Sequence, residues 1–459
     1  MKYLYLIRHA KSSWADNSLP DHLRPLNSRG LKQLGPMSKA VQAAGILNGP
    51  IFCSIATRAQ QTLHGLVPED LRQYTHVDPR LYTFNYKVLV DWLRKAEDSE
   101  SITLIGHNPA LEGLASYLLK HAPDSFPTCA FMQVALPVHH WHKLARGKGQ
   151  LEQFLTPRDV SYEQFNRKRR KTPGSTGAPP TQQIPEALQH QYSRMQDLET
   201  GVIQGYNNEF LHQYRIAVRR SRAIAESVCE INADTDLRRA VKTLKKHARA
   251  TSQLRDLHVF LADLQRWQLD EDIQAGLTSS GARSYFSNLA DLEHHALTTR
   301  LTGRKYRNDM GDWHWLITSR HFEKIIRKLA TEDIRKALNK RIQQYNTLAH
   351  QLSGQSADSD YHRLRKLLKR IRYLAELDKP AFREMLRQLK HRQQRFGDFQ
   401  DLHVQIEMLA TFCNSIATEP DMRVSVAGLN NLISSLASEK ACVRNEILTL
   451  GGIDGHPVL

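Results

Sequence analysis

Three short apolar runs in the first 110 residues each lead into basic side chains. The runs cover residues 3–7, 50–54 and 101–105; they are too short to cross a membrane and are typical of buried strands. In an open α/β sheet, residues just beyond the carboxyl ends of the strands line the ligand crevice. The sequence therefore predicts an α/β domain in which four basic side chains converge: Arg8, His9, Arg58 and His107.

These four side chains predict a pocket for a small dianion. A histidine at a strand exit can act as a nucleophile, and an arginine can hold an oxyanion through two N–H groups. Helical patterns begin near Thr57 and Ala110, and their amino termini would add backbone donors. An exposed Arg-His pair is common in proteins, but the recurrence of basic residues at three strand exits favours the phosphate pocket.

Four segments resemble the histidine phosphatase superfamily, in particular the compact SixA-type phosphohistidine phosphatases. The segments are LIRHAKSS (6–13), DHLRPLNSRG (21–30), ATRAQQT (56–62) and LIGHNPAL (104–111). The resemblance covers residues 1 to about 158 and implies a three-layer, phosphoglycerate-mutase-like α/β fold.

The same resemblance implies a role for each residue of the pocket. His9 would be the nucleophile that becomes phosphorylated. The phosphoryl oxygens would be held by Arg8, Arg58 and His107. Neither a metal nor another cofactor is implied, and Ser12 and Arg24 would lie at the rim.

One departure from the superfamily concerns the general acid. Larger branches place Glu or Asp before the second histidine, but residues 81–87 contain no carboxylate here. An alkyl phosphate needs an acid to protonate its alkoxide leaving group, whereas the ring nitrogen of a phosphoramidate is readily protonated. The sequence thus favours phosphohistidine or an anhydride as substrate, unless Asp16 or Asp21 reaches the site from its loop.

The length and the charge of the chain bear on its domains and partners. A chain of 459 residues predicts two or three domains, and a formal net charge of +17 indicates polyanionic partners. The five cysteines have no CxxC spacing, which suits a reducing cytoplasm. Neither a secretory leader nor a membrane span is expected.

A change of composition predicts the domain boundaries. Residues 161–185 combine a basic block with Pro, Gly, Ser and Thr and have no apolar periodicity, as in a linker. We therefore expect domains at residues 1–160 and 186–459. The second should be all-α, because helical periodicity dominates beyond the linker.

The helical part contains two repeated blocks. Residues 211–222 align with 361–372, and residues 244–259 align with 389–404. This repeat predicts two pseudo-symmetric helical bundles. In the first block, His212, Arg215, Arg219 and Arg222 share one helical face beside an apolar stripe. The stripes are Leu211, Tyr214 and Val218 in the first copy and Tyr361, Leu364, Leu368 and Ile371 in the second.

A purely basic face recurring in both copies predicts an anion between them, because like charges repel one another. The blocks resemble the conserved-histidine α-helical domain, CHAD, over residues 186 to about 450. That resemblance implies inorganic polyphosphate bound in a basic channel between two halves. The implied contacts are His212, Arg215, Arg219, Arg220, Arg222, His362, Arg365, Lys369, Arg370 and Arg372. His258 and His403 would be supports or contacts at the channel end, and Asp256 and Asp401 would orient neighbouring basic side chains.

Three further sequence features are not predicted to form functional sites. Residues 139–142 (His-His-Trp-His) fall in a strand-like stretch and are not predicted to bind metal. Trp313 and Trp315 are predicted core residues. Aromatic platforms do not interleave with the basic rows, so nucleic acid is not an expected partner.

The sequence therefore predicts a phosphohistidine phosphatase that also carries a polyphosphate-binding domain. Its expected partners are inorganic polyphosphate and a histidine-phosphorylated protein. One alternative is a polyphosphate or phosphoanhydride hydrolase, which would use the same pocket. Another is a non-catalytic polyphosphate scaffold, which the intact set of four pocket residues disfavours.

Overall fold

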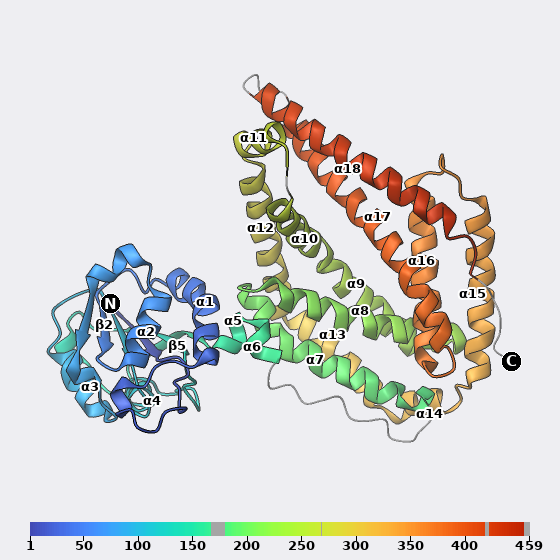
Figure 1. The fold of residues 1–459 in the computed structure, drawn as a ribbon. Helices are drawn as coiled ribbons and strands as arrows, with labels where there is room; N and C mark the ends of the chain where they lie inside the picture. The colour runs from blue at the N-terminus through green and yellow to red at the C-terminus, as the bar shows by residue number, and fades with distance from the viewer. Residues whose placement is uncertain (167–179, 268, 418–421, 454–459) are drawn as a thin grey trace. The chain divides into compact units, whose positions relative to one another are not determined.

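The computed structural model describes residues 1–166, 180–267, 269–417 and 422–453. By its internal contacts the chain divides into two compact units (Figure 1). One unit covers residues 1–171 and 204–207, and the other covers 172–203 and 208–459. The expected order, an α/β domain followed by an all-α domain, is confirmed.

The first unit is built on one six-stranded sheet with strand order β3-β2-β4-β1-β5-β6. The strands are β1 (Lys2–Arg8), β2 (Ile51–Ser54), β3 (Thr75–Asp78), β4 (Ser101–Gly106), β5 (Phe131–Leu136) and β6 (Gln150–Leu155). The pairs β1–β4, β4–β2 and β2–β3 are parallel. The pairs β1–β5 and β5–β6 are antiparallel. The three predicted runs are therefore β1, β2 and β4, and their carboxyl ends share one edge.

Helices cover both faces of the sheet, because the central strands are apolar on both sides. On β1, Leu4 and Leu6 pack in one buried cluster, and Tyr5 and Ile7 pack in the other. The first cluster includes residues of α3 (Tyr86–Arg94) and α4 (Ala110–Leu118), and the second those of α1 (Ser28–Ala43) and α2 (Thr57–Leu66). The predicted three-layer arrangement is confirmed.

Within the predicted linker, the described ends are helical. Residues Tyr162–Asn166 form α6, after the single turn of α5 (Pro157–Val160), and Pro180–Gln183 form the 3₁₀ turn η5. The basic block at 167–171 lies outside the described residues.

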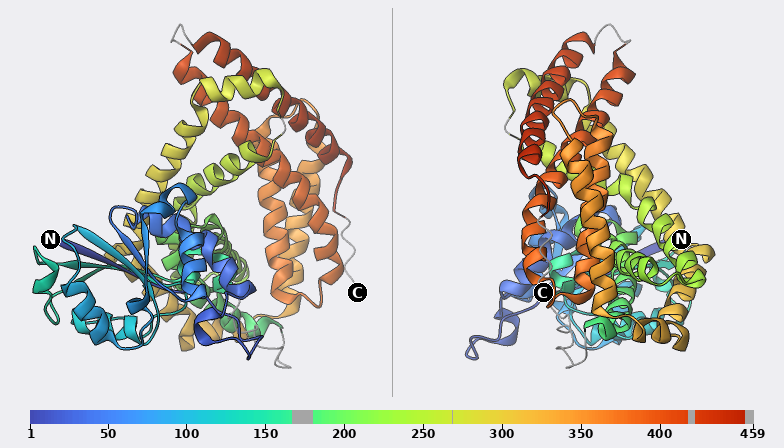
Figure 2. Two further views of the ribbon diagram at one scale, coloured as in Figure 1. Left: turned by 60° about the vertical axis from the view of Figure 1, so that its left-hand side comes forward. Right: turned by 90° about the vertical axis from the view of Figure 1, so that its right-hand side faces the viewer.

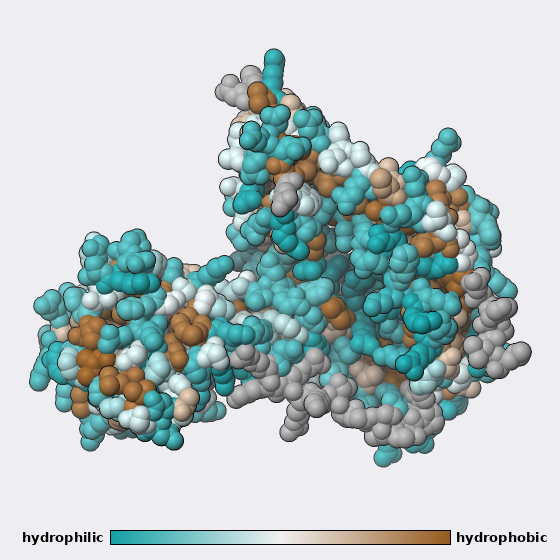
Figure 3. Space-filling view, in the orientation of Figure 1, coloured by the Kyte–Doolittle hydropathy of each residue, from teal (hydrophilic) through white to brown (hydrophobic). Residues whose placement is uncertain are grey.

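The second unit consists of helices. They are α7 (Ile184–Gln204), α8 (Asn208–Ile231), α9 (Thr235–Ala250), α10 (Ser252–Arg266), α11 (Glu271–Ser279), α12 (Ala282–Thr302), α13 (Arg304–Thr318), α14 (Arg320–Arg327), α15 (Thr331–Gln351), α16 (Asp358–Ala375), α17 (Arg383–Ile416) and α18 (Arg423–Thr449). No helix in the described ranges has an apolar stretch able to cross a bilayer. In the view of Figure 3, hydrophilic residues cover most of the visible surface of both units.

The sequence repeat corresponds to equivalent helices. The first block lies on α8 in the first half and on α16 in the second half. α8 packs against α9 and α10, and α16 packs against α17, which carry the second block. That block spans α9 and α10 in the first half, where the chain breaks at Thr251, but lies on the continuous α17 in the second half. Figures 1 and 2 show α17 and α18 running side by side. The predicted apolar stripes of α8 and α16 are buried, as expected.

Two local predictions are wrong. Trp315 is 70% exposed, whereas Trp313 is buried as predicted. The two residues are separated by about 200° around α13, so they cannot share a buried face. Residues 139–142 do not continue a strand: Trp141–Lys143 form a 3₁₀ turn, η4, in which Trp141 is buried. The Trp141 indole N–H donates to the Ser99 carbonyl at 3.0 Å, which fixes this turn.

Two glycines allow α11 and α18 to cross with their backbones in contact. A Cβ atom on Gly428 would lie 2.7 Å from the Asp272 carbonyl oxygen and 3.1 Å from the Cα of Gly276. Because both neighbours are backbone atoms, a side chain at this position requires the helices to separate.

We expect Gly428→Ala to destabilise the helical unit by about 1–3 kcal/mol, through overpacking at this crossing. The matched control is Gly311→Ala on α13, where a Cβ meets no atom within 4 Å. There, alanine should stabilise the helix by about 0.5–1 kcal/mol. Urea unfolding followed by helical circular dichroism measures both changes, and equal stability of the two variants would contradict the packing argument.

Candidate active site and basic cavity

The shared carboxyl edge of β1, β2 and β4 brings the four predicted pocket residues together. Arg58 Nε donates to His9 Nε2 at 3.3 Å, and the His9 and His107 ring centroids are 5.0 Å apart. His9, Arg58 and His107 are at most 8% exposed. Arg8 lies close enough for its charge to lower the pKa of His9.

The ring of His9 is fixed in the form that a nucleophile needs. Its Nδ1 lies 2.7 Å from the Ala10 carbonyl oxygen, which can only accept, so the proton is on Nδ1. The lone pair is then on Nε2. Burial, followed by the charges of Arg58 and Arg8, lowers the pKa of His9 to about 4. The imidazole is therefore neutral at pH 7.

Two buried polar atoms beside His9 have no hydrogen-bond partner among the described residues. They are Nε of Arg8 and Nδ1 of His107. The other nitrogen of His107, Nε2, lies 2.8 Å from Ser54 Oγ, and burial lowers the pKa of His107 to about 3. Because buried polar groups are normally paired, these two atoms are available to a bound anion.

Asp21 holds Arg58 in place. Its Oδ2 accepts from Arg58 Nη2 at 2.8 Å and from the Tyr82 hydroxyl at 2.7 Å. Burial alone would raise the pKa of Asp21, but the hydrogen bonds from Tyr82 and Arg58 outweigh it and keep the pKa below its usual value. Asp21 is thus an ionised partner of Arg58, and hydrogen bonds from Ser18 likewise lower the pKa of the exposed Asp16. In this arrangement both carboxylates lack the proton that a general acid must donate.

The two predicted rim residues act on the pocket indirectly. The guanidinium of Arg24 donates to Asp21 at 3.1 Å and to the Ser13 carbonyl, and it lies 3.1 Å from the ring centroid of Trp14. Ser12 pairs through its backbone with Leu26 in an isolated bridge. Both contacts secure the loop that carries Asp21.

Sequence reasoning missed two aromatic side chains beside His107. The ring centroid of Tyr82 lies 5.4 Å from that of His107, and the centroid of Phe84 lies 6.0 Å from it. Phe84 is 51% exposed. The alternating aromatics in residues 81–87 were the available signal.

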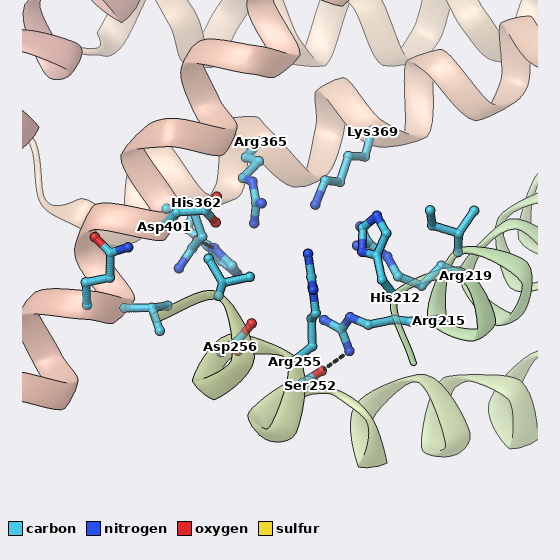
Figure 4. Close-up of a pocket in the computed structure, with 15 residues that line it drawn as sticks. His212, Arg215, Arg219, Ser252, Arg255, Asp256, His362, Arg365, Lys369 and Asp401 are labelled. Atoms are coloured by element: carbon cyan, nitrogen blue, oxygen red, sulfur yellow. Dashed lines mark hydrogen bonds between the residues drawn. The ribbon is translucent and has the colours of Figure 1, made fainter. Parts of the chain in front are cut away.

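A cavity of about 460 Å³ lies between α8, α10, α16 and α17 in the helical unit (Figure 4). Six of the ten predicted polyphosphate contacts line it: His212, Arg215, Arg219, His362, Arg365 and Lys369. These residues form three equivalent pairs from the two halves of the repeat.

Four predicted contacts do not line this cavity. Arg372 pairs with Glu376 one turn further along α16 at 2.7 Å, and Arg222 lies 3.4 Å from Glu226 on α8. Arg220 and Arg370 follow directly after lining residues, so each is turned about 100° around its helix. The predicted supports His258 and His403 also lie outside the lining, and His403 pairs with Asp358 at 3.2 Å.

The cavity also contains residues that the repeat did not single out. Arg255 lines the wall, and its equivalent in the second half is Gln400. The side-chain oxygen of Gln400 accepts from Nδ1 of His362 at 2.6 Å. The helix break at Thr251 holds Arg215, whose Nη1 donates to Thr251 Oγ1 at 3.0 Å and to Ser252 Oγ at 2.9 Å.

The cations in this cavity oppose one another. Burial, and then the charge of Arg219, lowers the pKa of Arg215 to about 10. Burial, and then Arg365, lowers the pKa of Lys369 to about 6. Nε of Arg365 is buried without a partner among the described residues. A multivalent anion would relieve both the repulsion and the missing hydrogen bonds. No three His, Cys, Asp or Glu side chains of the described residues form a metal-ligand group.

Part of the chain is similar in sequence to uncharacterised proteins. The uncharacterized protein Rv1276c of Mycobacterium tuberculosis is 29% identical over 165 residues, which cover 33% of this chain and 100% of that protein. The uncharacterized chloroplastic protein At3g52155 of Arabidopsis thaliana is 32% identical over 137 residues, covering 28% of this chain and 62% of that protein.

Two solved structures also match parts of the chain. The protein histidine phosphatase SixA complexed with tungstate is 21% identical, with 35% of this chain and 99% of that chain covered and a TM-score of 0.29. The CHAD domain from the plant Ricinus communis is 20% identical, with 60% and 91% covered and a TM-score of 0.49. Residues 186–410 match the sequence profile of the CHAD domain. The chain therefore contains a CHAD domain at residues 186–410.

Proposed function

We propose that the α/β domain is a phosphohistidine phosphatase that uses His9 as its nucleophile. The observation that carries this proposal is the fixed state of His9, which is buried and neutral, with its Nε2 lone pair beside Arg58. A neutral imidazole surrounded by cationic and N–H donors suits attack on a phosphoryl group.

The reaction has two displacements. Nε2 of His9 forms a bond to phosphorus as the P–N bond of the substrate breaks, and the departing imidazole nitrogen takes a proton from water. Water then attacks phospho-His9, so that inorganic phosphate leaves and His9 is restored, and the proton released by this water neutralises the hydroxide formed in the first step. Arg8, Arg58 and His107 would stabilise the charge on the phosphoryl oxygens in both transition states.

Two features support a phosphoramidate as substrate rather than an alkyl ester. Asp21 is held ionised by Tyr82 and Arg58, so it does not supply the proton that an alkoxide requires. The rings of Tyr82 and Phe84 beside His107 offer an apolar wall that suits a planar leaving group.

For the CHAD domain, we propose that the basic cavity binds inorganic polyphosphate. Lys and Arg side chains from α8, α10 and α16 converge on one space and lack enough counter-charge. Phosphate oxygens would supply acceptors to these cations, and such binding is strongly salt-dependent.

His9→Ala should lower phosphate release from a histidine-phosphorylated protein by at least ~10³-fold, because the nucleophile is lost. Trapping of acid-labile protein-bound phosphate should disappear with it, while polyphosphate binding should not change. The matched control is His64→Ala, since His64 is exposed on α2 of the same domain. Phosphate release retained by the His9 variant would refute the nucleophile assignment.

The pH profile gives a second test of His9. Because the pKa of His9 is about 4, the imidazole is neutral above this pH and protonated below it. We therefore expect kcat/KM to be level between pH 5 and 7 and to fall as the pH drops through about 4. Spontaneous hydrolysis, measured with His9→Ala, is subtracted at each pH. A fall centred near 6.5 would contradict the buried, neutral state.

Replacing four cavity cations by glutamine (Arg215, Arg219, Arg365 and Lys369) should weaken polyphosphate binding. The slope of log K against log salt should become shallower by about 2, at roughly 0.7 for each of the three arginine contacts, because Lys369 with its pKa of about 6 is largely uncharged at pH 7. The matched control replaces four exposed arginines outside the cavity: Arg239, Arg266, Arg327 and Arg387. Equal slopes in the two variants, measured by titration at several salt concentrations, would place binding elsewhere.

A further inference from the structure

Lys369 is a cavity residue whose chemistry differs from that of the arginines around it. It lies on α16, four residues after Arg365, and so shares a helical face with it. Its side chain extends toward the space that Arg365 and His212 border (Figure 4). Among the described residues, neither an ion pair nor a hydrogen bond joins its amine to an acceptor. The amine is therefore placed in the cavity without a direct counter-charge.

The charges that act on this amine are mostly positive. The charged or titratable groups in the cavity wall, besides Arg365, are Arg215, Arg219 and His212 of α8, Arg255 and Asp256 of α10, His362 of α16 and Asp401 of α17. The other elements packed on α16 are α15 and η6 (Glu376–Asp378), and neither contributes to the cavity wall. Burial, followed by the charges of Arg365, Arg219 and Arg215, lowers the pKa of Lys369 to about 6, and Asp401 opposes them only in part.

A lysine in this state is a nucleophile at neutral pH. Desolvation and neighbouring cations are two means by which proteins activate a lysine amine, because both favour its neutral form. At pH 7 about nine in ten of the Lys369 amines are neutral, against roughly four in ten thousand for a lysine of ordinary pKa. Lys369 can therefore attack an electrophile that enters the cavity.

The electrophile that fits this cavity carries a phosphate group. Nε of Arg365 is buried without a partner among the described residues, so it is available to a phosphate oxygen. Because Arg365 and Lys369 lie one turn apart, a phosphate held by the first places an attached carbonyl group beside the second. The cavity, of about 460 Å³, has room for a small molecule of this kind. In an acyl phosphate the carbonyl carbon is bonded directly to a phosphate oxygen, and phosphate is the leaving group.

We propose that the cavity of the CHAD domain is a site of lysine acylation, in which Lys369 accepts the acyl group of a small acyl phosphate. Nζ forms a bond to the carbonyl carbon, and the bond between this carbon and the phosphate oxygen breaks. The departing phosphate keeps the electron pair of that bond and takes the proton that Nζ loses. The products are an amide on Lys369 and inorganic phosphate, whose charge the arginines stabilise. This site goes beyond the proposed functions and does not require polyphosphate to bind.

The test incubates the full chain with a constant excess of acetyl phosphate and follows the acetylation of each lysine by mass spectrometry of its peptides. At pH 7 we expect Lys369 to react about tenfold faster, or more, than exposed lysines, because its larger neutral fraction outweighs the lower nucleophilicity of a less basic amine. Between pH 7 and pH 8 exposed lysines should accelerate about tenfold and Lys369 less than twofold.

The matched control residue is Lys366, which is exposed on the same helix three residues before Lys369. It should react like the other exposed lysines. Lys369 reacting no faster than Lys366, or accelerating equally between pH 7 and pH 8, would overturn the inference.

Competition tests whether the reagent reacts from within the cavity. Pyrophosphate should slow the acetylation of Lys369 and leave that of Lys366 unchanged, and equal rates for Lys369 with and without pyrophosphate would contradict the proposed site. Arg365→Gln should also slow Lys369, because it removes both a phosphate contact and a charge that keeps the amine neutral. If this variant fails to fold, judged by helical circular dichroism, the competition in the unaltered chain decides. Polyphosphate binding is measured separately, so its absence would refute the proposed function and not this site.

Discussion

Basic side chains are buried close together in both units of this chain, and few carboxylates lie beside them. Desolvation and mutual repulsion make such groups costly in the folded protein. The cost is visible in the lowered pKa of Lys369 and of His9. A bound anion would offset this cost in each site. Both proposed activities depend on this constraint.

The two units achieve the arrangement by different means. In the α/β unit, parallel pairing of β1, β4 and β2 places three strand exits at one edge, so residues distant in the sequence converge around His9. In the helical unit, the repeat brings basic residues together, because α8 and α16 each contribute an equivalent basic face. The α/β unit thus gathers its basic residues from three strand exits, and the helical unit gathers them from helices related by the repeat.

Local sequence patterns predicted several strands and many of the cavity residues. Long-range contacts explain the features that these patterns missed. The strands β1, β2 and β4 and the six cavity residues follow from apolar runs and helical spacing, which are local. The role of Asp21 depends on a contact with Arg58, 37 positions away, which no periodicity reveals. Trp315 was wrongly predicted to be buried because its apolar character was considered without its angular position on the helix. Arg255 was missed because its equivalent in the repeat is Gln400, so the pair lacks a common charge.

The treatment of histidine distinguishes the two sites chemically. His9 has its Nδ1 proton fixed by a backbone carbonyl, which leaves the lone pair on Nε2 as a nucleophile requires, and Arg58 Nε donates to that nitrogen at 3.3 Å. In the cavity, His362 likewise donates from Nδ1 to the side-chain oxygen of Gln400, so its lone pair is also on Nε2, and the charges around it are those of Lys366, Arg365 and Lys369. The two sites differ in how their histidines lie: the rings of His9 and His107 are 5.0 Å apart, whereas no ring contact among the described residues joins His212 to His362, although both line the cavity. This contrast favours polyphosphate as a ligand of the CHAD domain over polyphosphate as a substrate cleaved there.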